Sequence, residues 1–201
     1  MGVAMVTKLI EKISNYISIV GKRSSSQITN IVLHHSLTNG GDANSFRKYH
    51  VNFLSWKAMA YDVVITQQGF LQMGERWFYE IADNAEQLKN IIQFYNNEIG
   101  IKNKALLMAG FVDHYKAAGE WRQNMNTKGM HICLVGNFDK YKPNDTQIKT
   151  LTIFLKVFCL SFFKLYNKKL IISMHRDFNK GKSCPGNKFP IERVKKLCSL
   201  E

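Results

Sequence analysis

The sequence has few acidic residues and few cysteines, and it contains no long apolar run. Of its 201 residues, 15 are Asp or Glu and 28 are Lys or Arg, which leaves a formal net charge of +13 at pH 7. A positive field of this size favours polyanionic partners such as nucleic acid, an anionic membrane or an acidic cell wall, and charge alone does not choose among them. A hydrophobic fraction of 45% excludes a disordered chain, and the length predicts one principal domain with a real core.

The cysteines are too far apart to predict a disulfide framework. They are Cys133, Cys159, Cys184 and Cys198. Their spacings are long and include no CxxC pair, which also argues against a cysteine-rich zinc finger. Three of them lie in apolar runs and are expected to be small buried thiols. Cys184 differs, because it follows Ser183 in a polar loop and lies two residues after Lys182.

No segment predicts a membrane span or a secretory signal. The most apolar segment, 151–163, contains Lys156 and is shorter than the ~20 residues that a transmembrane helix needs. Residues 1–8 lack both a basic region before their apolar part and a small-residue cleavage site. We therefore expect synthesis in the cytoplasm without a signal peptide.

Alternating strand and helix patterns predict an α/β fold with a single mixed central β-sheet flanked by helices. The predicted strands are 31–33, 60–65, 70–73, 130–135 and 170–174, of which the second and third form a hairpin. The predicted helices are 45–56, 84–99, 103–117, a long helix that ends near 166, and one that begins at Pro190. The long helix is expected to be capped by 143–146 and to turn an apolar stripe towards the core.

Two segments have alternative interpretations. Residues 1–27 are expected to form an amphipathic helix, 3–20, and a polar linker. That helix either packs on the back of the domain or faces a membrane or a cell wall. The domain itself is expected to cover 28–201, with a helical insertion at about 77–111 that either packs into the core or covers a groove.

Two histidines and a cysteine are candidates for a metal site. His34 ends the first predicted strand, His175 follows the last one, and Cys184 lies nine residues further on. The two strand ends could meet at one edge of a sheet, and a catalytic zinc commonly has three protein ligands and one water. Against this, a single histidine is more often structural than ligating.

Two further residues could take part in a reaction at such a site. The ammonium of Lys182 could stabilise an oxyanion, and the phenol of Tyr61 could donate a hydrogen bond or shuttle a proton. Taken singly, they would be interpreted as a solvated lysine and a packed aromatic. His50, expected on a helix surface, and His131, expected in a strand, are predicted to be structural.

Four blocks of the sequence resemble one known family. The blocks are Ile31-Val-Leu-His-His35, Ala60-Tyr-Asp-Val-Val-Ile65, Gly136-Asn-Phe-Asp139 and His175-Arg-Asp-Phe with a following Lys-x-Cys-Pro-Gly. In this order they resemble zinc-dependent N-acetylmuramoyl-L-alanine amidases of type 2, which include phage amidase-type lysozymes and peptidoglycan recognition proteins. The resemblance covers roughly residues 28–200, so it implies a zinc amidase domain over 28–201.

The resemblance implies a role for each matching residue. It implies one Zn²⁺ bound by His34, His175 and Cys184. It implies catalytic roles for Tyr61 and Lys182. It implies substrate-binding positions at His35, His114, Asn137 and Arg176. The stretch from His175 to Cys184 is one residue longer than in many relatives, so Lys182 is matched by its offset from Cys184.

The implied reaction is hydrolysis of the amide between N-acetylmuramic acid and the L-alanine of the stem peptide, in a bacteriolytic phage endolysin or a bacterial wall-lytic enzyme. Cysteine at position 184 favours an enzyme, because recognition proteins that bind without cleaving typically lack it. We expect a monomer that acts on the cell wall after release and adheres to anionic envelope polymers. The alternatives are a non-catalytic peptidoglycan-binding module and a basic phage regulator of nucleic acid or polymerase, although no nucleic-acid motif is present.

Overall fold

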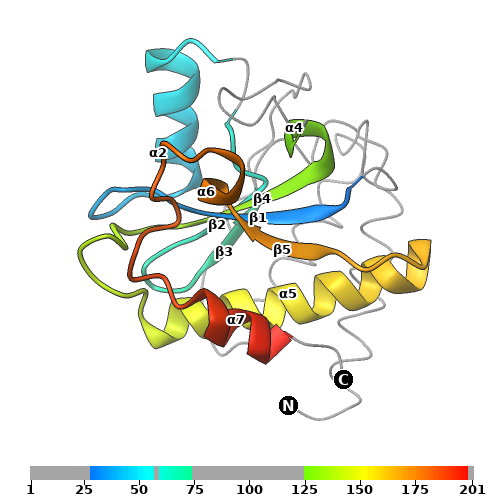
Figure 1. The fold of residues 1–201 in the computed structure, drawn as a ribbon. Coiled ribbons are helices and arrows are strands. Elements are labelled where there is room, and N and C mark those ends of the chain that lie inside the picture. Colours follow the sequence, from blue (N-terminus) through cyan, green and yellow to red (C-terminus); the bar gives the residue numbers. More distant parts are fainter. Residues whose placement is uncertain (1–27, 57–58, 74–124, 199–201) are drawn as a thin grey trace.

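A mixed sheet of five strands forms the centre of the described part of the chain, which in this computed structural model comprises residues 28–56, 59–73 and 125–198 (Figure 1). The strands are β1 (Asn30–His35), β2 (Val63–Ile65), β3 (Leu71–Met73), β4 (Gly129–Leu134) and β5 (Ile171–Met174). Their order is β3-β2-β4-β1-β5, with β2 and β3 antiparallel and the other neighbours parallel. The predicted fold class and the predicted hairpin are confirmed.

Helices flank this sheet. They are α2 (Ala43–Lys48), the π-helical turn η2 (Tyr49–Phe53), α4 (Met125–Lys128), α5 (Asp145–Tyr166), α6 (His175–Phe178) and α7 (Ile191–Cys198). Figure 1 shows α5 and α7 on one side of the sheet and α2 on the other. The helices predicted at 45–56, up to 166 and from Pro190 are present with shifted ends.

The main core lies between the sheet and α5. Strand residues point alternately to the two faces, and Ile31, Leu33 and Ile132 on one face belong to a buried cluster with the helices. The apolar stripe of α5 joins this cluster through Leu151, Leu155, Phe158 and Phe162. Burial of each such side chain stabilises the fold by about 1.5–3 kcal/mol, so the stripe is core material, as predicted.

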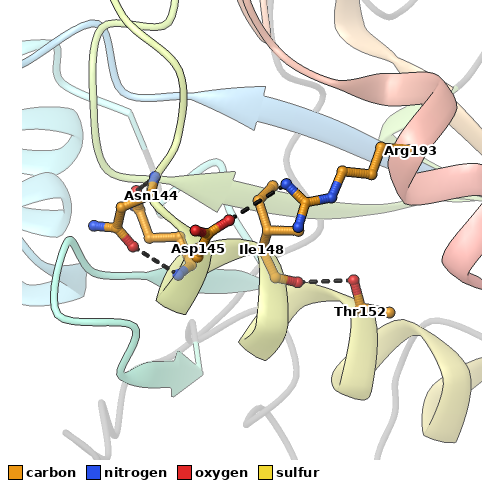
Figure 2. A network of polar contacts seen from close by, with 6 residues as sticks. Asn144, Asp145, Ile148, Thr152 and Arg193 are labelled. Carbon is orange, nitrogen blue, oxygen red and sulfur yellow. Dashed lines mark hydrogen bonds and ion pairs between the residues drawn. The ribbon is translucent and has the colours of Figure 1, made fainter.

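Specific residues fix both ends of α5. The side chain of Asn144 accepts a hydrogen bond from the backbone N–H of Gln147 at 2.9 Å, which satisfies a helix N-terminus (Figure 2). At the other end, Asn167 adopts the left-handed conformation with φ of 49°. An ion pair of 3.3 Å joins Asp145 to Arg193 of α7, but both side chains are largely exposed, so it contributes little.

The second face of the sheet carries polar side chains beside a smaller apolar cluster. In the register of β1 and β4, Val32 is opposite His131 and His34 is opposite Cys133, so both histidines face this side. The smaller cluster includes Phe46 of α2 and Val64 of β2.

Several sequence predictions lie outside the described residues. They are the helix and linker at 1–27, the helices at 84–99 and 103–117, the insertion at 77–111, and His114. The domain boundaries stay predictions. Among the described residues, no helix combines the length and the apolar character that crossing a bilayer requires.

Candidate metal centre

Three donor side chains converge at the carboxyl ends of β1 and β5. The donor atoms of His34, His175 and Cys184 all lie within 4.8 Å of one another. His34 is the next-to-last residue of β1, and His175 directly follows β5 as the first residue of α6. Because β1 and β5 are parallel neighbours, their carboxyl ends meet at one edge of the sheet.

The distance between one pair of donors, His34 and Cys184, fits a zinc ion. Nδ1 of His34 lies 3.6 Å from Sγ of Cys184. Zinc bonds of ~2.0–2.1 Å to nitrogen and ~2.3 Å to sulfur at a tetrahedral angle place two such ligands about 3.6 Å apart. Three ligands, here histidine and cysteine side chains, with a fourth position open are also the arrangement of a catalytic zinc. These three residues could therefore hold Zn²⁺.

His175 is neutral at neutral pH, as a metal ligand must be. Burial lowers the pKa of His175 to about 4, and the positive charge of Lys182 and then His35 contribute in the same direction. Its imidazole therefore keeps a lone pair for a metal.

The buried His131 contacts one of the donors. Nδ1 of His131 lies 2.9 Å from Nε2 of His34, and Nε2 of His131 lies 3.1 Å from the carbonyl oxygen of Met125. No sequence pattern connects His131 with the centre, because the contact depends on the register of β1 against β4. The spacing of residues along the chain does not predict that register.

A pocket of about 250 Å³ opens beside the three donors. Both predicted catalytic residues, Tyr61 and Lys182, are among the residues that line it. The ring of Tyr61 lies 5.4 Å from that of His34, centroid to centroid. A phenol, an ammonium and a candidate metal site therefore face one cavity.

His50 is buried, and its prediction as a helix-surface residue is wrong. It is 7% exposed and lines the same pocket. Its ring stacks on that of Trp56 at 4.7 Å and meets the ring of Tyr61 edge-on at 5.4 Å. The sequence did hold a signal, because Ala43, Phe46 and His50 are spaced for one helix face and the first two are apolar.

The loop that carries Lys182 and Cys184 is attached to the residues after β4. The carboxylate of Asp139 accepts hydrogen bonds from Oγ of Ser183 at 2.7 Å and from the backbone N–H of Asn187 at 2.8 Å. The bond from Ser183 is the main reason that the pKa of Asp139 is lowered. Gly186 has φ of 107°, and a Cβ there would lie 2.4 Å from the carbonyl carbon of Phe138, so a side chain at this position would push the loop away.

Of the described residues predicted to bind substrate, one lines the pocket and two do not. His35 lines the pocket, and its Nδ1 accepts the backbone N–H of Phe138 at 3.1 Å. Arg176 donates from Nη1 to the carbonyl oxygens of Ser183 and Gly186, at 3.2 and 3.4 Å, so it supports the loop. Neither Arg176 nor Asn137 is among the described residues that line the pocket. Their roles, like that of His114, stay predictions.

Fold and centre together define an α/β protein with a His-His-Cys cluster at the carboxyl edge of its parallel strands. The sequence model of the family described as N-acetylmuramoyl-L-alanine amidase (Amidase_2) matches residues 24–187. The chain belongs to this family. No curated protein matches the chain in a sequence search.

Solved structures of amidases and recognition proteins share the fold. The endolysin amidase LysCS from Clostridium intestinale URNW is 18% identical with a TM-score of 0.55, and 88% of each chain is covered. Drosophila PGRP-LB, solved as a Y78F mutant in complex with tracheal cytotoxin, is 15% identical with a TM-score of 0.52, covering 87% of this chain and 84% of its own. Manduca sexta peptidoglycan recognition protein-1 is 17% identical with a TM-score of 0.51, covering 83% of this chain and 77% of its own.

Proposed function

We propose that the protein is a zinc-dependent peptidoglycan hydrolase that cleaves the amide between N-acetylmuramic acid and the L-alanine of the stem peptide. Membership of the amidase family supports the reaction class. The observation that carries the proposal is that the three candidate metal donors, Tyr61 and Lys182 all line one pocket.

A zinc ion held by His34, His175 and Cys184 would polarise the amide carbonyl and lower the pKa of a bound water to ~7. The reaction adds water across the amide, which yields a carboxylic acid on the lactyl side and a free amine on L-alanine. The protein must therefore stabilise negative charge on the carbonyl oxygen and deliver a proton to the leaving nitrogen.

Lys182 and Tyr61 are suited to these two tasks. An ammonium at the rim of the pocket stabilises the oxyanion through charge, an effect typically worth about 10²–10³ in rate for one donor. The phenol of Tyr61 can donate a hydrogen bond to the same oxygen or pass a proton towards the departing amine. Phe46 and His50 meet the ring of Tyr61 edge-on and so restrict its position, and Trp56 lines the same pocket.

A non-catalytic recognition module is the second candidate. Several of the solved structures with this fold are peptidoglycan recognition proteins, and two were solved with tracheal cytotoxin. The complete donor set favours the enzyme, because binding of a muropeptide does not itself require two imidazoles and a thiol around one point. In either role the positive chain would be attracted to anionic polymers of the cell wall, where we propose that it acts.

Zinc content and wall digestion test the proposal together. We expect the purified protein to contain zinc and to release stem peptides with a free L-alanine amine from purified peptidoglycan, detected by mass spectrometry. Lys182→Ala should keep the zinc and lose about 10²-fold or more in turnover. Lys180→Ala, a change to an exposed lysine of the same loop, is the matched control and should leave both unchanged.

Two results would count against the enzyme. A metal-free wild-type protein that binds muropeptides without cleaving them would support the recognition module. Full turnover in Lys182→Ala would remove Lys182 from the reaction.

A further inference from the structure

We propose that His131 is a positioning residue that fixes the tautomer of His34, so that Nδ1 of His34 carries the lone pair for the metal. The inference rests on the proposed function for the existence of the metal site. It assigns a role to a residue of β4 that is not itself among the three candidate ligands.

The chain of contacts begins at a group that can only accept a hydrogen bond. Nε2 of His131 lies 3.1 Å from the carbonyl oxygen of Met125. A carbonyl oxygen has no proton to donate, so the proton of this contact belongs to Nε2 of His131. A neutral imidazole carries one N–H, which leaves a lone pair on Nδ1 of His131.

That lone pair determines the state of His34. Nδ1 of His131 lies 2.9 Å from Nε2 of His34, a hydrogen-bond distance. Since Nδ1 of His131 accepts, Nε2 of His34 must donate. The remaining nitrogen, Nδ1 of His34, then holds a lone pair, and this is the atom that lies 3.6 Å from Sγ of Cys184. The lone pair of His34 is therefore on the nitrogen that faces Cys184 even without a bound metal.

The surrounding structure holds His131 in this position. Its side chain is 1% exposed, and the backbone N–H of His131 donates to Oδ2 of Asp62 at 2.7 Å. The backbone N–H of Asp62 donates in return to the carbonyl oxygen of His131 at 2.8 Å. The ring therefore extends from a backbone that is fixed on both sides.

Gly129 leaves the space that the contact needs. A Cβ at this position would lie 2.9 Å from Nε2 of His131 and 2.6 Å from the carbonyl oxygen of Met125. Any side chain here would separate the two atoms whose contact sets the proton position. The contact between His131 and the carbonyl oxygen of Met125 therefore requires glycine at position 129.

A hydrogen bond from the second nitrogen of a ligating histidine both orients the ring and raises its basicity, and its loss typically weakens metal binding by about 10–100-fold. His131→Leu keeps a side chain of comparable size but removes the acceptor. His131→Asn keeps an acceptor oxygen near the position of Nδ1, because both atoms are attached to Cγ. We expect zinc affinity, measured by competition with a chelator, to fall about 10–100-fold in His131→Leu and by no more than about threefold in His131→Asn.

The state of the rings is measured on the metal-free wild-type protein. Nitrogen NMR of the histidine side chains should show His34 protonated on Nε2 and His131 protonated on Nε2, with a scalar coupling across the hydrogen bond between the rings. This readout needs neither zinc nor turnover, and it decides the proposal even if His131→Leu does not fold. Thermal unfolding of both variants checks that they fold.

The inference is overturned if His34 is protonated on Nδ1, or if folded His131→Leu binds zinc as tightly as the wild type. A wild-type protein that binds no zinc would instead contradict the proposed function. The two failures are distinguishable, because the positions of the ring protons are read without metal.

Discussion

At the scale of single residues, burial decides the protonation of the histidines around the pocket. His50 is 7% exposed, and burial lowers its pKa to about 4 from the ordinary value of 6.5. The neutral ring can accept the backbone N–H of Ala60, which lies 3.3 Å from its Nδ1. This keeps the ring between Trp56 and Tyr61, two residues of the pocket wall.

The shifted pKa of His50 predicts a loss of stability in mild acid. As the pH falls from 6.5 towards 4, the unfolded chain binds a proton at His50 and the folded chain does not, so the free energy of unfolding decreases. Between pH 7 and pH 5 this one group accounts for about 2 kcal/mol. His50→Gln should remove that part of the pH dependence, as measured by urea unfolding of metal-free protein at both pH values.

Comparing the wild type with His50→Gln isolates the contribution of His50 to the pH dependence of stability. The pKa of His175 is also lowered, to about 4, but this histidine is present in both proteins and cancels in the difference. Parallel curves of stability against pH for wild type and His50→Gln would contradict the assignment of a buried, neutral ring.

The residues of the centre differ in how far the sequence could predict them. His34 and His175 were found because each stands at the end of an apolar run, and strand ends of a parallel sheet share an edge. His131 was not predicted to contact His34, since the sequence separation of β1 and β4 does not predict which of their residues pair. Asp139 was missed because its partners, Ser183 and Asn187, are 44 and 48 residues away in the sequence.

At the scale of elements, the loop between α6 and α7 carries two residues of the proposed site, Lys182 and Cys184. Asp139 holds this loop by two hydrogen bonds, so Asp139→Ala should leave Oγ of Ser183 and the N–H of Asn187 without their acceptor. We expect a loss of about 1–3 kcal/mol in the free energy of unfolding, together with weaker zinc binding because Cys184 is in the same loop. Urea unfolding and chelator competition measure the two effects.

Asp145→Ala is the matched control for this element. It removes an aspartate of α5 whose side chain is 91% exposed and whose ion pair with Arg193 contributes little. It should cost about 1 kcal/mol or less and leave zinc affinity unchanged. If the two variants have the same effect on zinc affinity, Asp139 does not organise the loop.

The predictability of the elements follows their length and pattern. The long helix α5 has several turns of apolar periodicity and a capping sequence at Asn144, so it was predicted close to its observed bounds. Helices α4 and α6 have four residues each, too few for a periodic pattern, and were not predicted. The π-helical turn Tyr49–Phe53 likewise has no sequence signature, although it delivers His50 to the pocket.

At the scale of the whole molecule, the fold gathers the chemistry at one edge. Strands β4, β1 and β5 are parallel neighbours in the sheet. The three candidate donors lie at or beyond the carboxyl ends of β1 and β5, and the pocket opens beside them. The other face of the sheet is occupied by α5 and is apolar. A clostridial endolysin amidase that is 18% identical to the chain shares this fold.

The charge of the whole chain bears on where the protein acts. A net charge of +13 would favour the proposed contact with anionic polymers of a bacterial envelope, for an enzyme and for a recognition module alike. Charge therefore does not distinguish an enzyme from a recognition module, whereas a measurement of zinc content does.

Zinc content and stem-peptide release in Cys184→Ala, with Cys159→Ala as the control, test zinc-dependent cleavage most directly. Cys159 is a buried thiol of α5 within the main core, on the other side of the sheet from the donors. We predict about one zinc per chain and release of stem peptides in the wild type and in Cys159→Ala, and loss of both in Cys184→Ala. Full release of stem peptides by Cys184→Ala would contradict a reaction that depends on zinc bound by Cys184.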